Sequence, residues 1–286
     1  MRIGRVHIGD DVVWAVFDAE RAVHLPDGPF EARRGEVVGD VRELALAAPV
    51  SPGKIVCVGL NYAAHVTERD ATRKIPTEPV LFMKPVSALV GPGDPIQLAY
   101  RDHEVHHEAE LVVVIGRPTF QVNPRSTAKH ILGYTCGNDV SDRDLQKLDG
   151  QFVRAKGFDS YCPIGPWIET KVPPGDLMVE SRVNGEIRQS QSTRAMLWDV
   201  PALVSFVSWV MTLDAGDVIM TGTPEGVGPL RPGDTCEVSI NRLGTLTNPV
   251  TARKKVPRSV AALRRDGSAE GTGGRPDGLP ERRTDA

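Results

Sequence analysis

The sequence predicts a mainly β fold of the α+β class, with a few helices at its periphery. Three observations support this prediction. Apolar runs of strand length outnumber helical patterns, the pair Asn184-Gly185 is typical of a two-residue hairpin turn, and helical spacing is restricted to a few short segments. A chain of 286 residues is long enough for one large domain and a small additional one.

Residues 1–50 are expected to form a small β-rich N-terminal domain. Apolar and polar positions alternate there in short runs such as Val12–Phe17, and Pro26-Asp27-Gly28 marks a turn. The segment Ser51-Pro52-Gly53 then separates this unit from a large domain, which we expect to span residues 51–257.

The large domain is expected to contain several strands and two clear helices. Apolar runs predict strands at Ile55–Gly59, Pro79–Met83, Glu110–Ile115, Ile131–Cys136 and Gly216–Met220, and on both sides of the turn at Asn184-Gly185. One helix is predicted from Pro124 to about His130. The other begins near Asp199, has Pro201 in its first turn and keeps helical spacing to Met211.

Residues 258–286 are predicted to be a disordered C-terminal tail. This segment is rich in Arg, Gly, Asp, Pro and Glu, and it has almost no large apolar residue after Leu263. Such a composition can bury too little apolar surface to offset the entropy lost on ordering.

The charge and hydropathy patterns exclude several classes of partner. The formal net charge is −3 with acids and bases interspersed, so we expect no nucleic-acid partner. No apolar run is long enough to span a bilayer and the N-terminus lacks the apolar core of a signal peptide, so we expect a cytoplasmic protein without a membrane partner. The four cysteines are widely spaced, which favours buried free thiols.

Two carboxylates stand at the start of the most apolar strand. Glu108 and Glu110 are two positions apart, so a strand directs both to the same face. The run that follows is apolar at every position, which predicts burial on both faces and a need for a cation beside the carboxylates. The alternative is that both side chains extend from an exposed strand end into water.

A third carboxylate, Asp139, ends another apolar strand and could complete an all-oxygen site. Three carboxylates suit Mg²⁺ or Mn²⁺ better than zinc, which prefers nitrogen and sulfur ligands. His106 and His107 lie close in sequence and are candidates either for metal ligands or for hydrogen-bond partners of the ligands. Replacing Glu108 or Asp139 by alanine is expected to abolish activity and to leave the fold largely intact, because removing one of several like charges relieves repulsion in the metal-free state.

Further polar groups follow these strands. Arg143 offers a planar fork for a substrate carboxylate and Lys156 a compact cation for an enolate, although each alone is also typical of a solvated surface. The segment Thr221–Gly228 is a glycine-rich loop in which backbone amides and a threonine hydroxyl can approach a ligand. It lacks the Gly-Lys-Ser/Thr of a phosphate-binding loop, and no G-x-G-x-x-G motif indicates a nicotinamide cofactor.

Taken in order, these motifs resemble the fumarylacetoacetate hydrolase superfamily, in particular its branch of acylpyruvate hydrolases, oxaloacetate decarboxylases and 2-hydroxyhepta-2,4-diene-1,7-dioate isomerases. The resemblance extends over about residues 51–250. The matching stretches are Cys57–His65, Pro79–Pro85, Glu108–Gly116, Gly133–Gln146, Arg154–Asp159 and Thr221–Gly228.

The resemblance implies a mixed β-sandwich roll, a homodimer and specific site residues. It implies that the metal ligands are Glu108, Glu110 and Asp139, in agreement with the interpretation of the strand ends. It also implies that the substrate is surrounded by Arg143, Gln146, Lys156 and Thr223. Finally, it implies a dyad of His65 and Glu68 on a mobile lid, in which a carboxylate one helical turn away orients the imidazole and raises its basicity.

The implied activity is that of a Mg²⁺- or Mn²⁺-dependent hydrolase acting on a small 2-oxo acid. It would cleave a carbon–carbon bond in an acylpyruvate-type 2,4-dioxo acid such as fumarylpyruvate, a reaction of aromatic compound catabolism, through a metal-bound enolate of pyruvate type. Lys156 would stabilise the enolate, and His65 with Glu68 would activate water. Leu60 departs from the family pattern, because relatives often carry a basic residue there, and this predicts a substrate that is less acidic at one end.

Three alternatives remain at this stage. The same enolate site serves an oxaloacetate decarboxylase, and it serves a 2-hydroxyhepta-2,4-diene-1,7-dioate isomerase or tautomerase. An alternative of another class is a catalytically silent ligand-binding homologue, which is expected to have lost at least one of the carboxylates, the lysine or the dyad.

Overall fold

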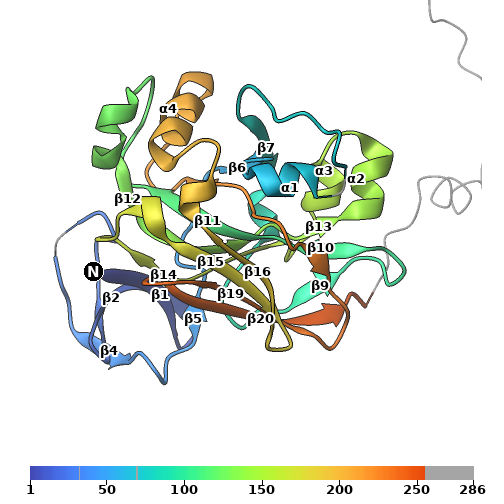
Figure 1. Ribbon diagram of the computed structural model, residues 1–286. Coiled ribbons are helices and arrows are strands. Elements are labelled where there is room, and N and C mark those ends of the chain that lie inside the picture. Colours follow the sequence, from blue (N-terminus) through green and yellow to red (C-terminus); the bar gives the residue numbers. More distant parts are fainter. Residues whose placement is uncertain (32, 69, 255–286) are drawn as a thin grey trace, which may run out of the picture. The chain divides into compact units, whose positions relative to one another are not determined.

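Strands dominate the computed structural model, which describes residues 1–31, 33–68 and 70–254 (Figure 1). The predicted tail at residues 258–286 lies outside the described residues. In chain order the strands are β1 (Arg2–Ile8), β2 (Asp11–Asp18), β3 (Arg21–His24), β4 (Val37–Asp40), β5 (Leu46–Ala47), β6 (Ile55–Gly59), β7 (Val80–Lys84), β8 (Leu89–Val90), β9 (Ile96–Leu98), β10 (Val105–His107), β11 (Ala109–Ile115), β12 (Ile131–Asn138), β13 (Ser141–Asp142), β14 (Cys162–Glu169), β15 (Met178–Val183), β16 (Glu186–Ser192), β17 (Val218–Met220), β18 (Gly228–Pro229), β19 (Thr235–Ile240) and β20 (Gly244–Ala252).

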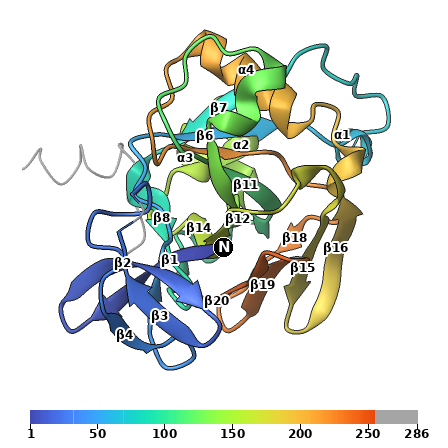
Figure 2. The same cartoon turned by 90° about the vertical axis from the view of Figure 1, so that its left-hand side faces the viewer.

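The helices are short and lie at the periphery of the sheets (Figures 1 and 2). The α-helices are α1 (Ala63–Thr67), α2 (Arg143–Asp149), α3 (Val153–Lys156) and α4 (Val200–Val210). The 3₁₀ turns are η1 (Val86–Ala88), η2 (Pro124–Lys129), η3 (Pro174–Asp176) and η4 (Thr193–Ala195). Within the described residues, none of these helices has the length and apolar composition needed to cross a bilayer.

Three sheets organise the described chain. A 12-stranded sheet runs in the order β4-β3-β2-β1-β14-β12-β11-β17-β6-β7, with β5 beside β1 and β8 beside β14. A five-stranded sheet has the order β16-β15-β19-β20-β9, and a three-stranded sheet has the order β13-β10-β18. The mainly β, α+β fold that the sequence predicts is therefore confirmed.

Strand β11 forms the centre of the large sheet and is buried along its whole length. Leu111, Val113 and Ile115 pack into a core that also contains apolar residues of α4 and of the five-stranded sheet. Val112 and Val114 pack on the opposite face, in a second core. The prediction of burial on both faces is thus confirmed, and Glu108 and Glu110, at the start of this strand, lie in an interior, low-dielectric region.

Local sequence signals determine several elements as expected. Asn184 and Gly185 both have positive φ, 54° and 83°, as a type I′ turn between β15 and β16 requires. Helix α4 begins after Asp199, whose side chain accepts a hydrogen bond from the Ala202 amide. The helix predicted from Pro124 is a 3₁₀ turn, capped by Asn123, because this short segment never continues into regular α-helical hydrogen bonding.

The strands of residues 1–50 continue the large sheet. Strand β1 pairs with β14 through the registers of Arg2 with Glu169 and Ile3 with Ile168. Met1–Arg253 form one compact unit, so these strands and the strands that follow residue 50 share a single folded body. The division of the chain into domains near residue 50 stays a prediction.

Candidate metal centre and active site

Three carboxylates converge where strand β11 begins and strand β12 ends. Glu108, Glu110 and Asp139 are all buried, and each offers one oxygen within 4.8 Å of the others. The β-ladder explains this placement: Ala109 pairs with Asn138, and one step further the Asp139 amide donates to the Glu108 carbonyl at 2.9 Å. The convergence that the sequence predicts is therefore present in the structure.

Buried cations pair with two of these carboxylates. Lys156, at the end of α3, donates to Glu108 at 2.9 Å and also donates to Asp139. Arg143, at the start of α2, donates to Glu108 and to the side chain of Gln146, the latter at 2.9 Å. Lys84, at the end of β7, donates to Asp139 at 2.5 Å.

Glu110 differs from its two neighbours because no ion pair involves it among the described residues. Its Oε2 accepts a hydrogen bond from the Gly222 amide at 2.8 Å. Burial, together with the charges of Asp139 and Glu108, raises the pKa of Glu110 well above its ordinary value. A buried carboxylate without a cation, beside two others, fits a divalent cation held by oxygen ligands.

The electrostatic surroundings hold Glu108 and Lys156 in their charged states. Burial opposes ionisation, but Lys156 and Arg143 lower the pKa of Glu108 well below its ordinary value. Burial likewise opposes the charge of Lys156, and the carboxylates of Asp139 and Glu108 outweigh it and raise the pKa of this lysine. Lys156 is therefore an ammonium group, able to stabilise negative charge that develops on a ligand.

The cluster opens into a cavity of about 340 Å³. Its walls also carry the aromatic side chains of Phe82 and Phe152, whose rings pack edge to face with centroids 5.5 Å apart. The residues predicted for the site that line this cavity are His65, Glu108, Glu110, Asp139, Arg143, Gln146, Lys156 and Thr223.

His65 and Glu68 form the predicted pair on α1 and its C-cap. Nδ1 of His65 lies 2.9 Å from Oε2 of Glu68. Since an ionised carboxylate only accepts, Nδ1 is the donor of this pair, and in the neutral form of the imidazole Nε2 then carries the lone pair. The other oxygen, Oε1 of Glu68, accepts from the amide of Gly226 at 2.7 Å. The glycine-rich loop thus fixes the carboxylate that orients the imidazole.

Glycine is required at two positions of this loop. Gly222 has φ +97°, and a Cβ there would lie 2.7 Å from the Cβ of Asn61. Gly226 has φ +92°, and a Cβ there would lie 2.1 Å from the carbonyl oxygen of Arg188. The close approach places the Gly222 amide on Glu110 and the Gly226 amide on Glu68.

The two histidines before Glu108 are not part of the carboxylate cluster. Nε2 of His106 lies 2.5 Å from Oε1 of Glu104. Nδ1 of His107 lies 3.2 Å from Oε1 of Gln189, and its Nε2 is buried without a hydrogen-bond partner among the described residues. This geometry favours supporting roles for both histidines over metal ligation.

Burial of His107 makes the stability of the protein depend on pH. Burial lowers the pKa of His107 from 6.5 to about 4, so the unfolded chain binds a proton that the folded protein excludes. We expect the free energy of unfolding to decrease as the pH falls from 6.5 towards 4, by at most about 3 kcal/mol from this group. Urea unfolding at several pH values measures this change.

The control is His107→Asn, whose amide can still donate to Gln189 but does not titrate. This variant is expected to lose the part of the pH dependence that His107 causes. If wild type and variant show equal slopes between pH 6.5 and 4, His107 is not the group responsible.

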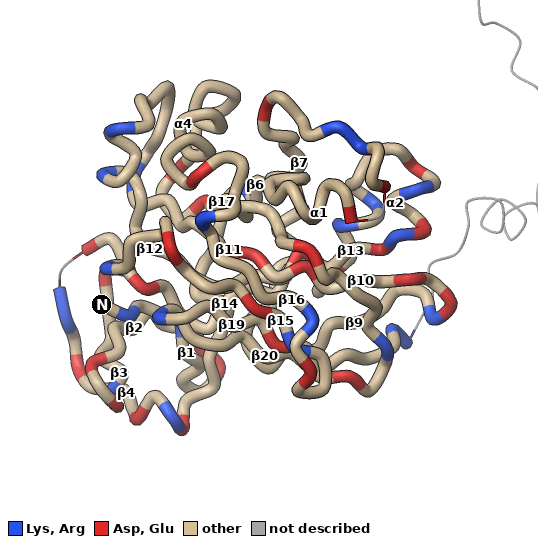
Figure 3. The backbone as a smooth tube through the Cα atoms, in the orientation of Figure 1, with Lys and Arg blue, Asp and Glu red and all other residues tan. Residues whose placement is uncertain are grey.

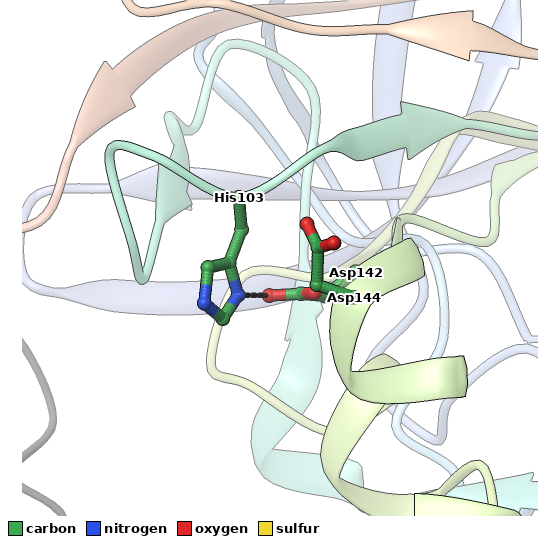
Figure 4. Close-up of side chains that lie close together, drawn as sticks. All are labelled: His103, Asp142 and Asp144. Carbon is green, nitrogen blue, oxygen red and sulfur yellow. Dashed lines mark hydrogen bonds and ion pairs between the residues drawn. The ribbon is translucent and has the colours of Figure 1, made fainter. Parts of the chain in front are cut away.

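A second cluster holds α2 in place (Figure 4). Oδ2 of Asp142, the N-cap of α2, lies 2.7 Å from Nδ1 of His103. Asp144 accepts from the amide of Glu104 at 2.7 Å. Both carboxylates already have protein donors, so we assign this cluster to positioning the helix that carries Arg143.

Two groups of the site carried no prediction from the sequence. Lys84 ends an apolar strand, and a single lysine in such a strand is the available signal, because a buried ammonium needs an anion. Ser141 accepts from Lys156 at 2.7 Å, and nothing distinguishes it from other serines in the sequence.

Along the described chain as a whole, Lys and Arg are interspersed with Asp and Glu (Figure 3).

The fold and the site together define a class of protein, in which strand-end carboxylates and buried cations line one cavity of a β-rich scaffold. The sequence profile described as "Fumarylacetoacetate (FAA) hydrolase C-terminal" matches residues 54–251. The chain belongs to the fumarylacetoacetate hydrolase family. Members of this family include enzymes that tautomerise, isomerise and hydrolyse their substrates.

Relatives by sequence cover most of the chain. A protein of Mycobacterium tuberculosis is 44% identical over 269 residues, which are 89% of this chain and 100% of the relative. Oxaloacetate tautomerase YisK of Bacillus subtilis is 39% identical over 233 residues, which are 76% of this chain and 76% of the relative.

Solved structures show the same fold. The 2-hydroxyhepta-2,4-diene-1,7-dioate isomerase from Mycobacterium marinum has a TM-score of 0.80 and 44% identity, covering 89% of this chain and 100% of that chain. The maleylpyruvate hydrolase from a Sphingobium species, in complex with manganese(II) and pyruvate, has a TM-score of 0.74 and 29% identity, covering 89% of this chain and 100% of that chain.

Proposed function

We propose that this protein is a Mg²⁺- or Mn²⁺-dependent enzyme that acts on a small 2-oxo acid through an enolate of pyruvate type. The observation that carries the proposal is Glu110, a buried carboxylate that has no ion pair with any described residue and lies beside Glu108 and Asp139. When bound, a divalent cation supplies positive charge that polarises the 2-oxo group and stabilises the enolate. The solved relative that contains manganese(II) and pyruvate supports this assignment.

The charges of the site fit an anionic substrate. The three carboxylates are balanced by the cations of Lys84, Lys156 and Arg143. A divalent cation therefore adds an excess of positive charge, which an anionic 2-oxo acid neutralises. Because these side chains are buried, their charges act more strongly than they do in water.

The rim of the cavity offers further cations. Arg73 and Lys147 line it, and neither has an ion pair with a carboxylate among the described residues. Leu60 lines the same cavity with a φ of 61°. Although position 60 carries a leucine and no basic residue, Arg73 and Lys147 still supply positive charge to the cavity. A substrate with a second acidic end is therefore compatible with this cavity.

The dyad supplies proton transfer. Because Glu68 holds Nδ1 of His65, Nε2 is the atom that accepts or returns a proton. In tautomerisation or isomerisation, this atom moves a proton to or from C3 of the 2-oxo acid. In hydrolysis of an acylpyruvate, it removes a proton from the attacking water. Lys156 stabilises the developing enolate oxygen in every case.

Two net reactions are supported by different observations. Tautomerisation or isomerisation is supported by the relatives with 39% and 44% identity, which are named for these reactions. Carbon–carbon bond hydrolysis of an acylpyruvate, the reaction that the sequence predicts, is supported by the maleylpyruvate hydrolase at 29% identity. We rank tautomerisation or isomerisation first, since proton transfer by His65 needs no additional water site.

A substrate panel tests the proposal. Acylpyruvates, fumarylpyruvate, oxaloacetate and 2-hydroxydienedioates are each incubated with the protein and Mg²⁺ or Mn²⁺, and cleavage, decarboxylation and tautomerisation are followed separately. We expect cation-dependent conversion of at least one of them. No conversion of any substrate, together with no cation-dependent increase of the melting temperature, would favour the catalytically silent homologue.

A further inference from the structure

Gln189, at the middle of β16, connects three parts of the site with one side chain. It is 1% exposed and makes four hydrogen bonds, all to protein atoms. Its Oε1 accepts from the amide of Ala109, the residue between Glu108 and Glu110, at 2.9 Å. Its Nε2 donates to Oγ1 of Thr223 at 2.8 Å.

Backbone groups determine the orientation of this amide. The Ala109 amide can only donate, so the atom that faces it is the oxygen. The carbonyl of Pro224, 2.8 Å away, can only accept, so the atom that faces it is the nitrogen. If the amide were flipped, its nitrogen would face the N–H of Ala109 and its oxygen would face the carbonyl of Pro224. Donor would then meet donor and acceptor would meet acceptor, which excludes the flipped assignment.

This orientation determines what the hydroxyl of Thr223 can do. Oγ1 must accept from Nε2 of Gln189, and its own proton is donated to the carbonyl of Ala109 at 2.9 Å. A hydroxyl has one proton and two lone pairs, so a single lone pair is left. Thr223 lines the cavity, and the group that it offers to a ligand is therefore an acceptor.

We infer that Gln189 is a positioning residue that, together with the carbonyl of Ala109, restricts Thr223 to accepting a hydrogen bond from the ligand. The ligand atom that meets Thr223 consequently carries a proton, as an enol or alcohol hydroxyl does and as an oxo or carboxylate oxygen does not. This inference rests on the proposed function for the class of ligand. It adds to that function a selectivity for the hydroxyl-bearing form of a 2-oxo acid.

Two probes that differ in the group at C2 test the selectivity. Lactate carries a hydroxyl at C2 and pyruvate an oxo group, and calorimetry in the presence of Mn²⁺ gives the dissociation constant of each. Thr223→Val should weaken lactate binding by about tenfold, because the hydroxyl loses its acceptor, and pyruvate binding by less than about threefold. Thr223→Ser, the conservative control, should keep both constants within about threefold of wild type.

A double-mutant cycle tests whether Gln189 acts through Thr223. Gln189→Met removes the amide at similar size, and it should weaken lactate binding in the wild-type background but not in the Thr223→Val background. Equal losses in both backgrounds, or equal losses of lactate and pyruvate on Thr223→Val, overturn the inference. The metal dissociation constant is measured for each variant, so that a loss of metal is distinguished from a loss of ligand contact.

Failure of the proposed function has a different signature. If wild type binds neither lactate nor pyruvate with Mn²⁺, the assigned class of ligand is wrong. Wild type, Thr223→Val, Gln189→Met and the double variant are then compared by urea unfolding, which needs no ligand. Non-additive shifts of the midpoint support the coupling of Gln189 to Thr223, and additive shifts overturn it.

Discussion

Glu110→Gln is expected to abolish divalent-cation binding and turnover while leaving the cation-free protein at least as stable as the wild type. Glu110 is buried among like charges and has no cationic partner among the described residues. A neutral amide relieves this repulsion and its oxygen can still accept from the Gly222 amide. Calorimetric titration with Mn²⁺ measures the loss of binding, and urea unfolding in chelator measures the stability.

Asp139→Asn is the matched comparison and should behave differently. It also removes a proposed ligand, but it leaves the buried ammonium groups of Lys84 and Lys156 short of an anion. Breaking such a pair from one side costs about 3–5 kcal/mol of stability. The sequence alone predicts that removal of Glu108 or Asp139 leaves the fold largely intact, and the ion pairs of Asp139 lead us to expect a cost in stability instead. If Glu110→Gln bound Mn²⁺ with the affinity of the wild type, the assignment of Glu110 as a metal ligand would be wrong.

The dyad variants should have the second largest effect. His65→Ala and Glu68→Gln are each expected to lower the rate of tautomerisation or acylpyruvate hydrolysis by at least about a hundredfold, because both reactions need a base within hydrogen-bond reach. Loss of carbon dioxide from oxaloacetate needs no such base and should be affected much less. Steady-state rates with saturating Mg²⁺ measure tautomerisation and decarboxylation on this one substrate.

Two controls make this result specific. Thr67→Ala changes the same helix without touching the dyad and should keep the wild-type rate. The Mn²⁺ dissociation constant should be unchanged in His65→Ala, since this residue is not proposed as a ligand. Normal rates of tautomerisation and hydrolysis in both dyad variants would exclude His65 as the base of these reactions.

Much of the scaffold follows from local sequence signals. The continuous apolar run after Glu110 specifies a strand buried on both faces, and the positive φ angles of Asn184-Gly185 specify the hairpin of β15 and β16. The same run identifies the neighbouring carboxylates as candidate site residues, because charged side chains at the start of a buried strand need partners of opposite charge. The resemblance to the family identified His65 and Glu68, which spacing alone would have left as a surface pair.

The remaining parts depend on tertiary contacts. Lys84 and Asp139 are 55 positions apart, and their ion pair arises because the large sheet brings β7 and β12 to the same cavity. Gln189 contacts Ala109 across two different sheets, and nothing in its neighbourhood in sequence distinguishes it from Gln191. The 3₁₀ turn after Pro124 likewise packs against α4, an element that is distant from it in the sequence.

Exchange of C3 hydrogens for deuterium tests the central claim most directly, because every reaction proposed for this site passes through the same enolate. Pyruvate and oxaloacetate are incubated in D₂O with the protein and Mg²⁺, and proton NMR follows the C3 signal against a protein-free control. We predict exchange that requires Mg²⁺, is abolished by chelator and is absent in Glu110→Gln. Exchange at the protein-free rate with both acids, in the presence of Mg²⁺ or Mn²⁺, would contradict an enolate-forming metal centre at Glu108, Glu110 and Asp139.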